Sequence, residues 1–156
     1  MKTKVLIVNA NYYRAISNRL EIGAKTVLKN AKISFIKISV PGVFEIPIII
    51  SKNIKKFDGF IALGCVIKGE TPHFEFISQA TTNALMKLSI DHKKPVANGI
   101  ITALNISQAI NRSNIKFKKV TKKNKGIEAA NAVVTILKIL KQKKRWIKKK
   151  NWKIQE

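Results

Sequence analysis

Residues 57–74 read FDGFIALGCVIKGETPHF, and this stretch decides the fold. Its first part is a continuous apolar run, which is typical of a β-strand covered on both faces, so we expect a buried strand over residues 57–67. Thr71 and Pro72 then give a strong helix-start signal, a capping hydroxyl followed by proline at the first helical position. The stretch therefore predicts a buried strand that leads directly into a helix.

The same alternation of strand and helix extends in both directions from this stretch. Short apolar runs predict further strands, and apolar residues at helical spacing predict the helices between them. The expected strands cover residues 5–8, 33–40, 57–67 and 95–102, and the expected helices cover residues 11–30, 47–56, 71–88, 105–112 and 127–140. Lysine crowds residues 113–123, which we expect to form a loop. Strands that alternate with helices pair in parallel, so the fold class is α/β: a three-layer αβα sandwich with a four-stranded parallel sheet.

Length and composition are those of a single domain. The chain has 156 residues, of which 46% are hydrophobic, and this is enough for a core without disulfides or metal. We expect the α/β domain to cover residues 1–142 and a basic C-terminal tail to cover residues 143–156. The single cysteine, Cys65, excludes an intramolecular disulfide and a zinc site built from several cysteines. The sequence contains neither a signal-peptide core nor an apolar run of membrane-span length, so we expect a cytoplasmic protein with no membrane partner.

Positive charge is concentrated in residues 116–125 and 138–153. With 31 Lys and Arg against 8 Asp and Glu, the net charge is +23, which leaves polyanions, anionic surfaces and phosphorylated small molecules open as partners. One interpretation of the lysine runs is a solvated surface. The other is a polyanion-binding tail in which Trp146 and Trp152 stack on bases. Only four of the basic residues are arginine, the residue that base readout favours, and this argues against nucleic acid as a partner.

Three motifs carry the functional signal, and the first two follow expected strands at the sheet edge where α/β proteins bind ligands. They are VPGVFEIP at residues 40–47, GCVIKGETPHF at residues 64–74 and NKGIEAA at residues 124–130. Together and in this order they resemble the lumazine synthase family of riboflavin biosynthesis, and the resemblance covers about residues 4–140. It implies a flavodoxin-like sheet topology and an enzyme that needs no metal and no organic cofactor.

The resemblance implies a transferase that condenses 5-amino-6-(D-ribitylamino)uracil with 3,4-dihydroxy-2-butanone 4-phosphate. The product is 6,7-dimethyl-8-ribityllumazine, formed with release of phosphate and water. The resemblance also implies a homo-oligomer whose active sites are shared between neighbouring subunits. We expect a homopentamer rather than an icosahedral shell, because residues 113–123 are longer than the matching loop of shell-forming relatives and lack its glycine. Few residues precede the first strand, and highly positive pentamers would repel one another, which supports the same expectation.

His73 is the catalytic residue that the resemblance implies, and its role is to move a proton. Its place in the first helical turn supports this role, because the positive end of the helix dipole favours a neutral imidazole that can accept a proton. The same helix start offers backbone N–H groups around Gly69, Glu70 and Thr71 to a phosphate. A glycine at position 69 lets the backbone approach such a ligand closely.

The resemblance also assigns the remaining substrate-binding positions. Arg112 and Lys125 hold the phosphate, for which a guanidinium fork is well suited. Tyr12 stacks on the flat pyrimidinedione ring. The others are Val43, Phe44 and Glu45 beside the ribityl chain, Cys65, Val66 and Ile67 at the uracil edge, and Asn98, which comes from a neighbouring subunit.

Several alternatives stay open at this point. Phe44 fits an ordinary core position equally well, and Cys65 is expected to be a buried small hydrophobe rather than a nucleophile. Asn98 stands where some members of the family carry a phenylalanine, and Tyr13 stands where an asparagine is often found. If Asn98 reaches the ring, it does so by hydrogen bonding rather than stacking. For the whole chain, the alternative is a basic α/β nucleic-acid-binding module that has lost the activity. Riboflavin synthase is a weaker possibility, because GETPHF matches the earlier enzyme.

Overall fold

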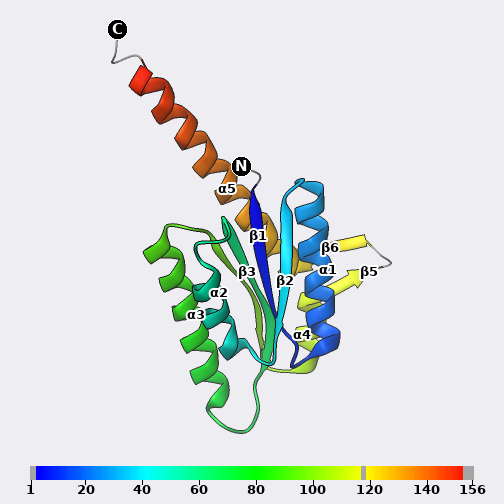
Figure 1. Cartoon of the computed structure of the whole chain (residues 1–156). Helices are drawn as coiled ribbons and strands as arrows, with labels where there is room; N and C mark the ends of the chain where they lie inside the picture. Colours follow the sequence, from blue (N-terminus) through cyan, green and yellow to red (C-terminus); the bar gives the residue numbers. More distant parts are fainter. Residues whose placement is uncertain (1–2, 117–118, 153–156) are drawn as a thin grey trace.

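The computed structural model describes residues 3–116 and 119–152 (Figure 1). Strands and helices alternate up to the fourth strand and its following helix, and a short hairpin then leads into a long last helix. In chain order the elements are β1 (Lys4–Ala10), α1 (Arg14–Asn30), β2 (Ser34–Val40), the 3₁₀ turn η1 (Val43–Glu45), α2 (Ile46–Asn53), β3 (Gly59–Ile67), α3 (His73–His92), β4 (Val96–Ala103), α4 (Ile106–Arg112), β5 (Ser113–Lys116), β6 (Lys119–Asn124) and α5 (Lys125–Trp152).

Strands β1 to β4 form one parallel sheet in the order β2-β1-β3-β4. Val8 in β1 lies opposite Ile38 of β2 and Ala62 of β3. Parallel neighbours joined through helices are what right-handed crossovers produce, and this strand order is that of flavodoxin-like sheets. The predicted α/β fold class with a four-stranded parallel sheet is therefore confirmed.

Helices cover both faces of the sheet and give the molecule three layers (Figure 1). Helices α2 and α3 lie on one face, and α1 and α5 lie on the other. The buried side chains of β1 divide in the same way: Leu6 and Val8 belong to the core with α2, while Val5 and Ile7 belong to the core with α1 and α5. Successive side chains of a strand point to opposite faces, which explains why VLIV in β1 is an unbroken apolar run.

Residues 113–123 are not a simple loop, contrary to our expectation. Strands β5 and β6 form an antiparallel hairpin in which Ser113 pairs with Asn124 and Ile115 pairs with Val120. The strand pattern was hidden because the two strands are short and rich in lysine, a residue that is depleted from strands in general. The hairpin contacts α1 and α4 and brings the chain to the start of α5.

Helix α3 begins later than its sequence signal indicates. It starts at His73, with Pro72 in the preceding position, and no described side chain caps its start. The prediction that Thr71 caps the helix and that Pro72 is its first residue is therefore wrong. Pro72 has a φ of −70°, which fits the approach to a helix, and its carbonyl accepts the first helical bond from the backbone N of Phe76 at 3.4 Å.

Helix α5 runs continuously to Trp152, beyond the last expected helical residue at position 140. Its far end projects from the body of the molecule, at the end of the sheet where the strands begin (Figure 1). The division into a domain at residues 1–142 and a tail at residues 143–156 stays a prediction. Among the helices of the described chain, none combines the length and the apolar character that crossing a membrane requires.

Candidate active site

A cleft of about 410 Å³ opens where β1 and β3 end, beside η1 and the start of α3. We call it the aromatic cleft. It is lined by Tyr12, Tyr13, Gly42, Val43, Phe44, Glu45, Cys65, Val66, Ile67, His73 and Ile77. Crevices of this kind form at the carboxyl ends of parallel strands. The structure therefore brings eight of the predicted site residues together at one edge of the sheet, while their roles stay predictions.

Two exposed aromatic rings belong to this cleft. Tyr12 is 76% exposed and Phe44 is 60% exposed, which are high values for large apolar side chains. Phe44 is therefore not a core residue of this chain, and its place beside the ribityl chain stays a prediction. Flat rings that are free on one side are suited to stacking on a flat ligand.

Tyr13 packs against Tyr12 in an edge-to-face arrangement, with 5.0 Å between the ring centroids. Burial raises the pKa of Tyr13, and the neighbouring Tyr12 and Cys65 raise it further. The Tyr13 hydroxyl is therefore protonated at neutral pH and can donate a hydrogen bond. In sequence, Tyr13 stood out only as a departure from the family pattern, so its place in the cleft was missed.

The turn that carries Val43, Phe44 and Glu45 is held by a hydrogen bond between its own residues. The Glu45 Oε2 atom accepts a hydrogen bond from the backbone N of Gly42 at 3.0 Å. Val43 packs so close to β3 that a Cβ atom on Gly64 would lie 2.7 Å from the Val43 Cγ1 atom, an approach that requires glycine. This packing holds η1 against the sheet, while the Glu45 side chain remains exposed and can accept further hydrogen bonds.

The end of β3 supplies Cys65, Val66 and Ile67 to the aromatic cleft. Cys65 is buried, and burial raises the pKa of its thiol to about 11. The thiol is therefore protonated at neutral pH and is a poor nucleophile. This agrees with the interpretation of Cys65 as a small buried hydrophobe.

His73 lines the aromatic cleft from the first position of α3, and its side chain is exposed. Gly69, Glu70 and Thr71 lie in the loop just before the helix, and they do not line this cleft. A Cβ atom on Gly69 would meet nothing of the described chain within 4 Å. The backbone at Gly69 is therefore open to a ligand. We expected these three residues at the helix start, but they lie before the first helical turn.

A second cleft, of about 450 Å³, lies beside β4, α4 and the start of α5. We call it the cationic cleft. It is lined by Asn98, Ile100, Ile101, Thr102, Ala103, Gln108, Asn111, Arg112 and Lys125. The predicted residues Asn98, Arg112 and Lys125 thus meet here and not in the aromatic cleft. The Oδ1 atom of Asn98 accepts a hydrogen bond from the backbone N of Ile100 at 3.0 Å, which holds this amide along the strand.

Glu128 joins the two cations of this cleft. Its Oε2 atom lies 3.3 Å from the Lys125 Nζ atom and 3.8 Å from the Arg112 Nη2 atom. All three side chains are partly exposed, so these ion pairs orient the cations more than they stabilise the fold. Sequence reasoning missed the role of Glu128. The signal was present, since Lys125 and Glu128 are three residues apart and such residues lie on one face of a helix.

Asn124 and Gly126 place Lys125 at the cationic cleft. The Asn124 Oδ1 atom accepts hydrogen bonds from the backbone N of Gly126 at 2.9 Å and of Ile127 at 3.2 Å, and so caps α5. A Cβ atom on Gly126 would lie 2.1 Å from the carbonyl oxygen of Leu20. Helix α5 can therefore approach α1 this closely only with glycine at this position, and both neighbours of Lys125 in the NKG motif have structural roles.

The two clefts are lined by different elements. The aromatic cleft is lined by the turn after β1, by η1, by the end of β3 and by the start of α3, and the cationic cleft is lined by β4, α4 and the start of α5. Of the described residues that line the two clefts, none is shared. Within one chain, the exposed aromatic rings and the cationic groups therefore belong to separate cavities.

Comparisons with known proteins agree with the three sequence motifs. Residues 2–141 match the family model described as 6,7-dimethyl-8-ribityllumazine synthase. The chain is similar to proteins of that name from Bartonella tribocorum, with 41% identity over 144 residues covering 90% of this chain and 92% of the relative, and from Campylobacter jejuni strain 81-176, with 39% identity over 147 residues covering 90% and 91%. The protein of that name from Blochmanniella pennsylvanica is 42% identical over 149 residues, covering 90% and 89%. A match of this length and identity confirms the resemblance, and the chain belongs to the 6,7-dimethyl-8-ribityllumazine synthase family.

Proposed function

We propose that the chain is a transferase that condenses 5-amino-6-(D-ribitylamino)uracil with 3,4-dihydroxy-2-butanone 4-phosphate to 6,7-dimethyl-8-ribityllumazine, with release of phosphate and water. Membership of the family supports this proposal. The observation that carries it is the gathering of His73 with exposed rings in one cleft and of Arg112 with Lys125 in another. The buried free thiol of Cys65 fits a reducing compartment, and we place the enzyme in the cytoplasm.

The aromatic cleft suits the ribitylaminouracil. The exposed ring of Tyr12 offers a stacking surface for the flat heterocycle. The backbone at the end of β3, next to Cys65, offers donors and acceptors to the uracil edge. The exposed carboxylate of Glu45 accepts hydrogen bonds from ribityl hydroxyls.

The cationic cleft suits the phosphate. The guanidinium of Arg112 can donate two parallel hydrogen bonds to phosphate oxygens, and Lys125 adds a second positive charge. The separation of 3.8 Å between Arg112 and Glu128 is longer than a hydrogen bond. Arg112 is therefore free to turn toward a phosphate without breaking a strong contact.

Neighbouring subunits unite the two clefts in this proposal. The aromatic cleft of one subunit faces the cationic cleft of the next, so that both substrates meet between them. A contact between two different surfaces of the same chain must close into a ring or grow into a filament. The resemblance implies a ring of five, and we therefore propose a homopentamer with Asn98, on the edge strand β4, at the boundary between subunits.

Catalysis in such a shared site comes mainly from holding the two substrates together, which makes a bimolecular condensation effectively unimolecular. His73 accepts and returns the proton that is moved during phosphate elimination. Arg112 and Lys125 stabilise the negative charge on the departing phosphate.

The direct test is to incubate the purified chain with both substrates and to follow the lumazine chromophore. Formation of the product, dependent on both substrates, is the expected result. Lack of product above the uncatalysed rate would contradict the proposed function.

A mixing experiment tests whether the site is shared. With the phosphorylated substrate kept below the wild-type KM, His73→Ala and Arg112→Ala subunits are each expected to have strongly reduced turnover alone. After they are unfolded and refolded together, some contacts pair an intact aromatic cleft with an intact cationic cleft, and activity returns. No recovery in mixed oligomers of confirmed composition would place each site within one chain.

A further inference from the structure

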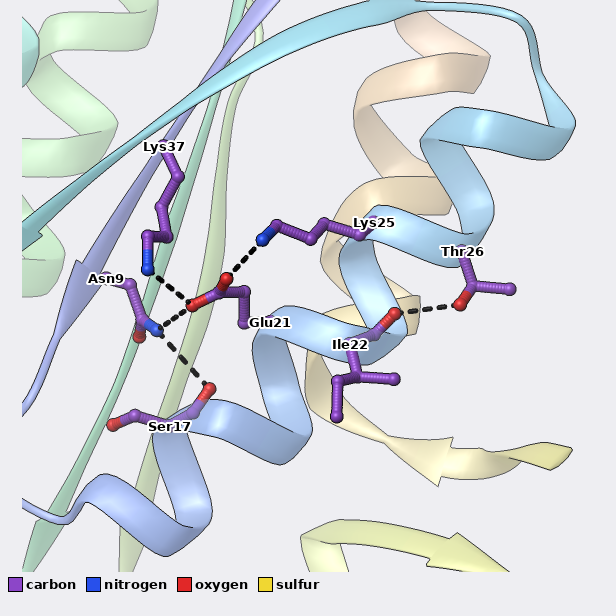
Figure 2. Close-up of polar contacts among 7 residues, drawn as sticks. All are labelled: Asn9, Ser17, Glu21, Ile22, Lys25, Thr26 and Lys37. Atoms are coloured by element: carbon purple, nitrogen blue, oxygen red, sulfur yellow. Dashed lines mark hydrogen bonds and ion pairs between the residues drawn. The ribbon is translucent and has the colours of Figure 1, made fainter. Parts of the chain in front are cut away.

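A buried polar cluster lies between α1, β1 and β2 (Figure 2). At its centre is Glu21, which is only 9% exposed. Its carboxylate accepts a hydrogen bond from the Asn9 Nδ2 atom at 3.0 Å, and it pairs with Lys37 at 3.3 Å and with Lys25. One carboxylate thus ties together three elements of the fold.

The Glu21 carboxyl group at the centre of the cluster is ionised at neutral pH. Burial raises the pKa of Glu21, but hydrogen bonds from Lys25 and Asn9, together with the charge of Lys25 and a hydrogen bond from Lys37, outweigh it, and the pKa is below its ordinary value. A carboxylate in this state is an acceptor only, so it can hold its donors in one arrangement. The three donors come from different elements and therefore fix Glu21 from three directions.

Asn9 connects Glu21 to the end of β1 through hydrogen bonds. Its Nδ2 atom also donates to the carbonyl oxygen of Ser17 at 3.4 Å. The Asn9 Oδ1 atom has no hydrogen-bond partner among the described residues, so Glu21 and Ser17 are what hold this buried amide. The hydroxyl of Ser17 donates in turn to the carbonyl oxygen of Ala10, the last residue of β1.

The turn that follows Ala10 carries both tyrosines of the aromatic cleft. The backbone N of Asn11 donates to the carbonyl oxygen of Val40 at 2.9 Å, and the backbone N of Ser17 donates to the carbonyl oxygen of Tyr13 at 2.9 Å. Ser17 therefore holds the turn on both sides, through its hydroxyl at Ala10 and its backbone at Tyr13.

The rest of the contact between α1 and the sheet is apolar. Ile16, Leu20, Ala24 and Leu28 pack there with Val5 and Ile7. Apolar burial stabilises without fixing direction, and a buried ion pair is often replaceable by apolar residues with little loss of stability. The polar cluster reaches toward the cleft through Asn9, the residue before the last of β1, and Ser17, in the first turn of α1.

We propose that Glu21 is a positioning residue for the proposed reaction. Through Asn9 and Ser17 it fixes the β1–α1 turn, and this turn carries Tyr12 and Tyr13, which receive the heterocyclic substrate in the aromatic cleft. The proposal rests on the proposed function for its consequence in catalysis. Its structural part, the fixed position of Tyr12 and Tyr13, can be measured without any substrate.

The test compares Glu21→Leu and Glu21→Gln with the matched control Asp91→Asn. Both acids pair with a lysine one helical turn away, but Asp91 is exposed at the far end of α3. The chain has only two tyrosines, both in the turn, so fluorine NMR of 3-fluorotyrosine-labelled protein reports on the turn alone. We expect Glu21→Leu to shift or broaden both resonances, Glu21→Gln to change them less because it keeps an acceptor for Asn9, and the control to leave them unchanged.

The kinetic result expected is selective. Glu21→Leu should raise KM for the ribitylaminouracil about threefold to tenfold, the effect of one misplaced hydrogen bond, and leave KM for the phosphorylated substrate unchanged. Tyrosine resonances that do not respond to Glu21→Leu, or an equal rise in both KM values, would overturn the proposal. If Glu21→Leu does not fold, as judged by circular dichroism, the same two measurements on Glu21→Gln decide. If the wild-type chain forms no product while the resonances respond, the proposed function fails and the positioning of the turn stands.

Discussion

The aromatic cleft and the cationic cleft differ in how the chain builds them. The aromatic cleft is made from strand ends, two tight turns and the start of α3, and backbone hydrogen bonds and close packing at Gly64 hold the turns that carry its rings. The cationic cleft is lined by β4 and carries its cations at the ends of two helices, where Glu128 pairs with Arg112 and Lys125 through partly exposed ion pairs. One cleft presents rings on packed turns, and the other presents charges on long, partly exposed side chains.

This difference matches what each cleft is proposed to bind. A flat heterocycle needs a surface of fixed orientation, because stacking and edge hydrogen bonds are directional. A phosphate needs positive charge within a few ångströms, and long side chains can adjust to it. The comparison therefore predicts that variants in the two clefts affect different substrates, and that the effects separate cleanly.

The largest expected effect is in the aromatic cleft, from His73→Ala. We expect kcat to fall by up to ~10²–10⁴-fold, the usual contribution of a general acid–base group, or by less where the uncatalysed condensation sets the floor. Binding of inorganic phosphate should be unchanged, because the cationic cleft is untouched. His92→Ala, at the other end of the same helix, is the control. Full turnover in His73→Ala would remove the proton-transfer role.

In the cationic cleft, Arg112→Ala should weaken the phosphorylated substrate by about 1.5–3 kcal/mol, the contribution of a charge-assisted hydrogen bond. Affinity for the ribitylaminouracil should stay the same. Titration of each substrate separately measures the two effects, and Arg112→Lys should fall in between because it keeps the charge without the fork. An equal loss of affinity for both substrates would mean that Arg112 is structural and that the two clefts do not bind different substrates.

Gly126→Ala tests how the cationic cleft is held in place. The added Cβ atom would lie 2.1 Å from a backbone oxygen of α1, so we expect the free energy of unfolding to fall by about 3 kcal/mol, the upper end of the usual overpacking cost. Urea unfolding measures the change. Gly69→Ala is the matched control, because a Cβ atom there would meet nothing of the described chain within 4 Å. Similar losses in both variants would contradict the packing argument.

A smaller effect is expected at Cys65 in the aromatic cleft. Burial raises the pKa of its thiol to about 11, so the thiol is protonated at pH 8 and its thiolate fraction grows only as the pH rises toward that value. Alkylation by iodoacetamide at pH 8 should therefore be much slower than for a free thiol of pKa ~8.5, and it should accelerate with increasing pH. Rapid, pH-independent modification would instead indicate an activated nucleophile.

The smallest effect is expected from deleting residues 143–156. The described residues that line the two clefts all precede residue 126, and the far end of α5 lies at the opposite end of the sheet from the carboxyl ends of the strands (Figure 1). Fold, oligomeric state and both KM values should stay as in the full chain, as measured by circular dichroism, light scattering and assay. Unfolding of the shortened chain would show that the boundary at residue 142 is misplaced.

The strands and the family could be predicted from the sequence because their signals are local. Apolar runs such as VLIV and FIAL report burial on both faces, and GETPHF is a contiguous motif. The hairpin at residues 113–124 escaped because lysine obscures a short strand pattern. The contact between Asn9 and Glu21 also escaped, because it joins two polar residues of different elements and depends on how α1 lies on the sheet.

The division of the predicted site between two clefts could not be read from the motifs either. Asn98, Arg112 and Lys125 are as close in sequence to the GETPHF motif as some residues of the aromatic cleft are. Which cleft they reach depends on the path of the chain around the sheet and on where α5 begins. Only the three-dimensional arrangement shows that they stand apart from His73.

The Asn124 side chain has a consequence for the order in which the molecule folds. Its Nδ2 atom donates to the carbonyl oxygen of Arg19 at 3.1 Å, across a sequence separation of 105 residues. Contacts of such separation form late, because the entropy of closing a long loop must be overcome before they contribute. The described residues that line the aromatic cleft all precede residue 78, whereas the cationic cleft takes its lining from residues as far along the chain as Lys125. During synthesis, a growing chain therefore contains every one of these aromatic-cleft residues before it contains Lys125, and the contact between Asn124 and α1 can form only after that.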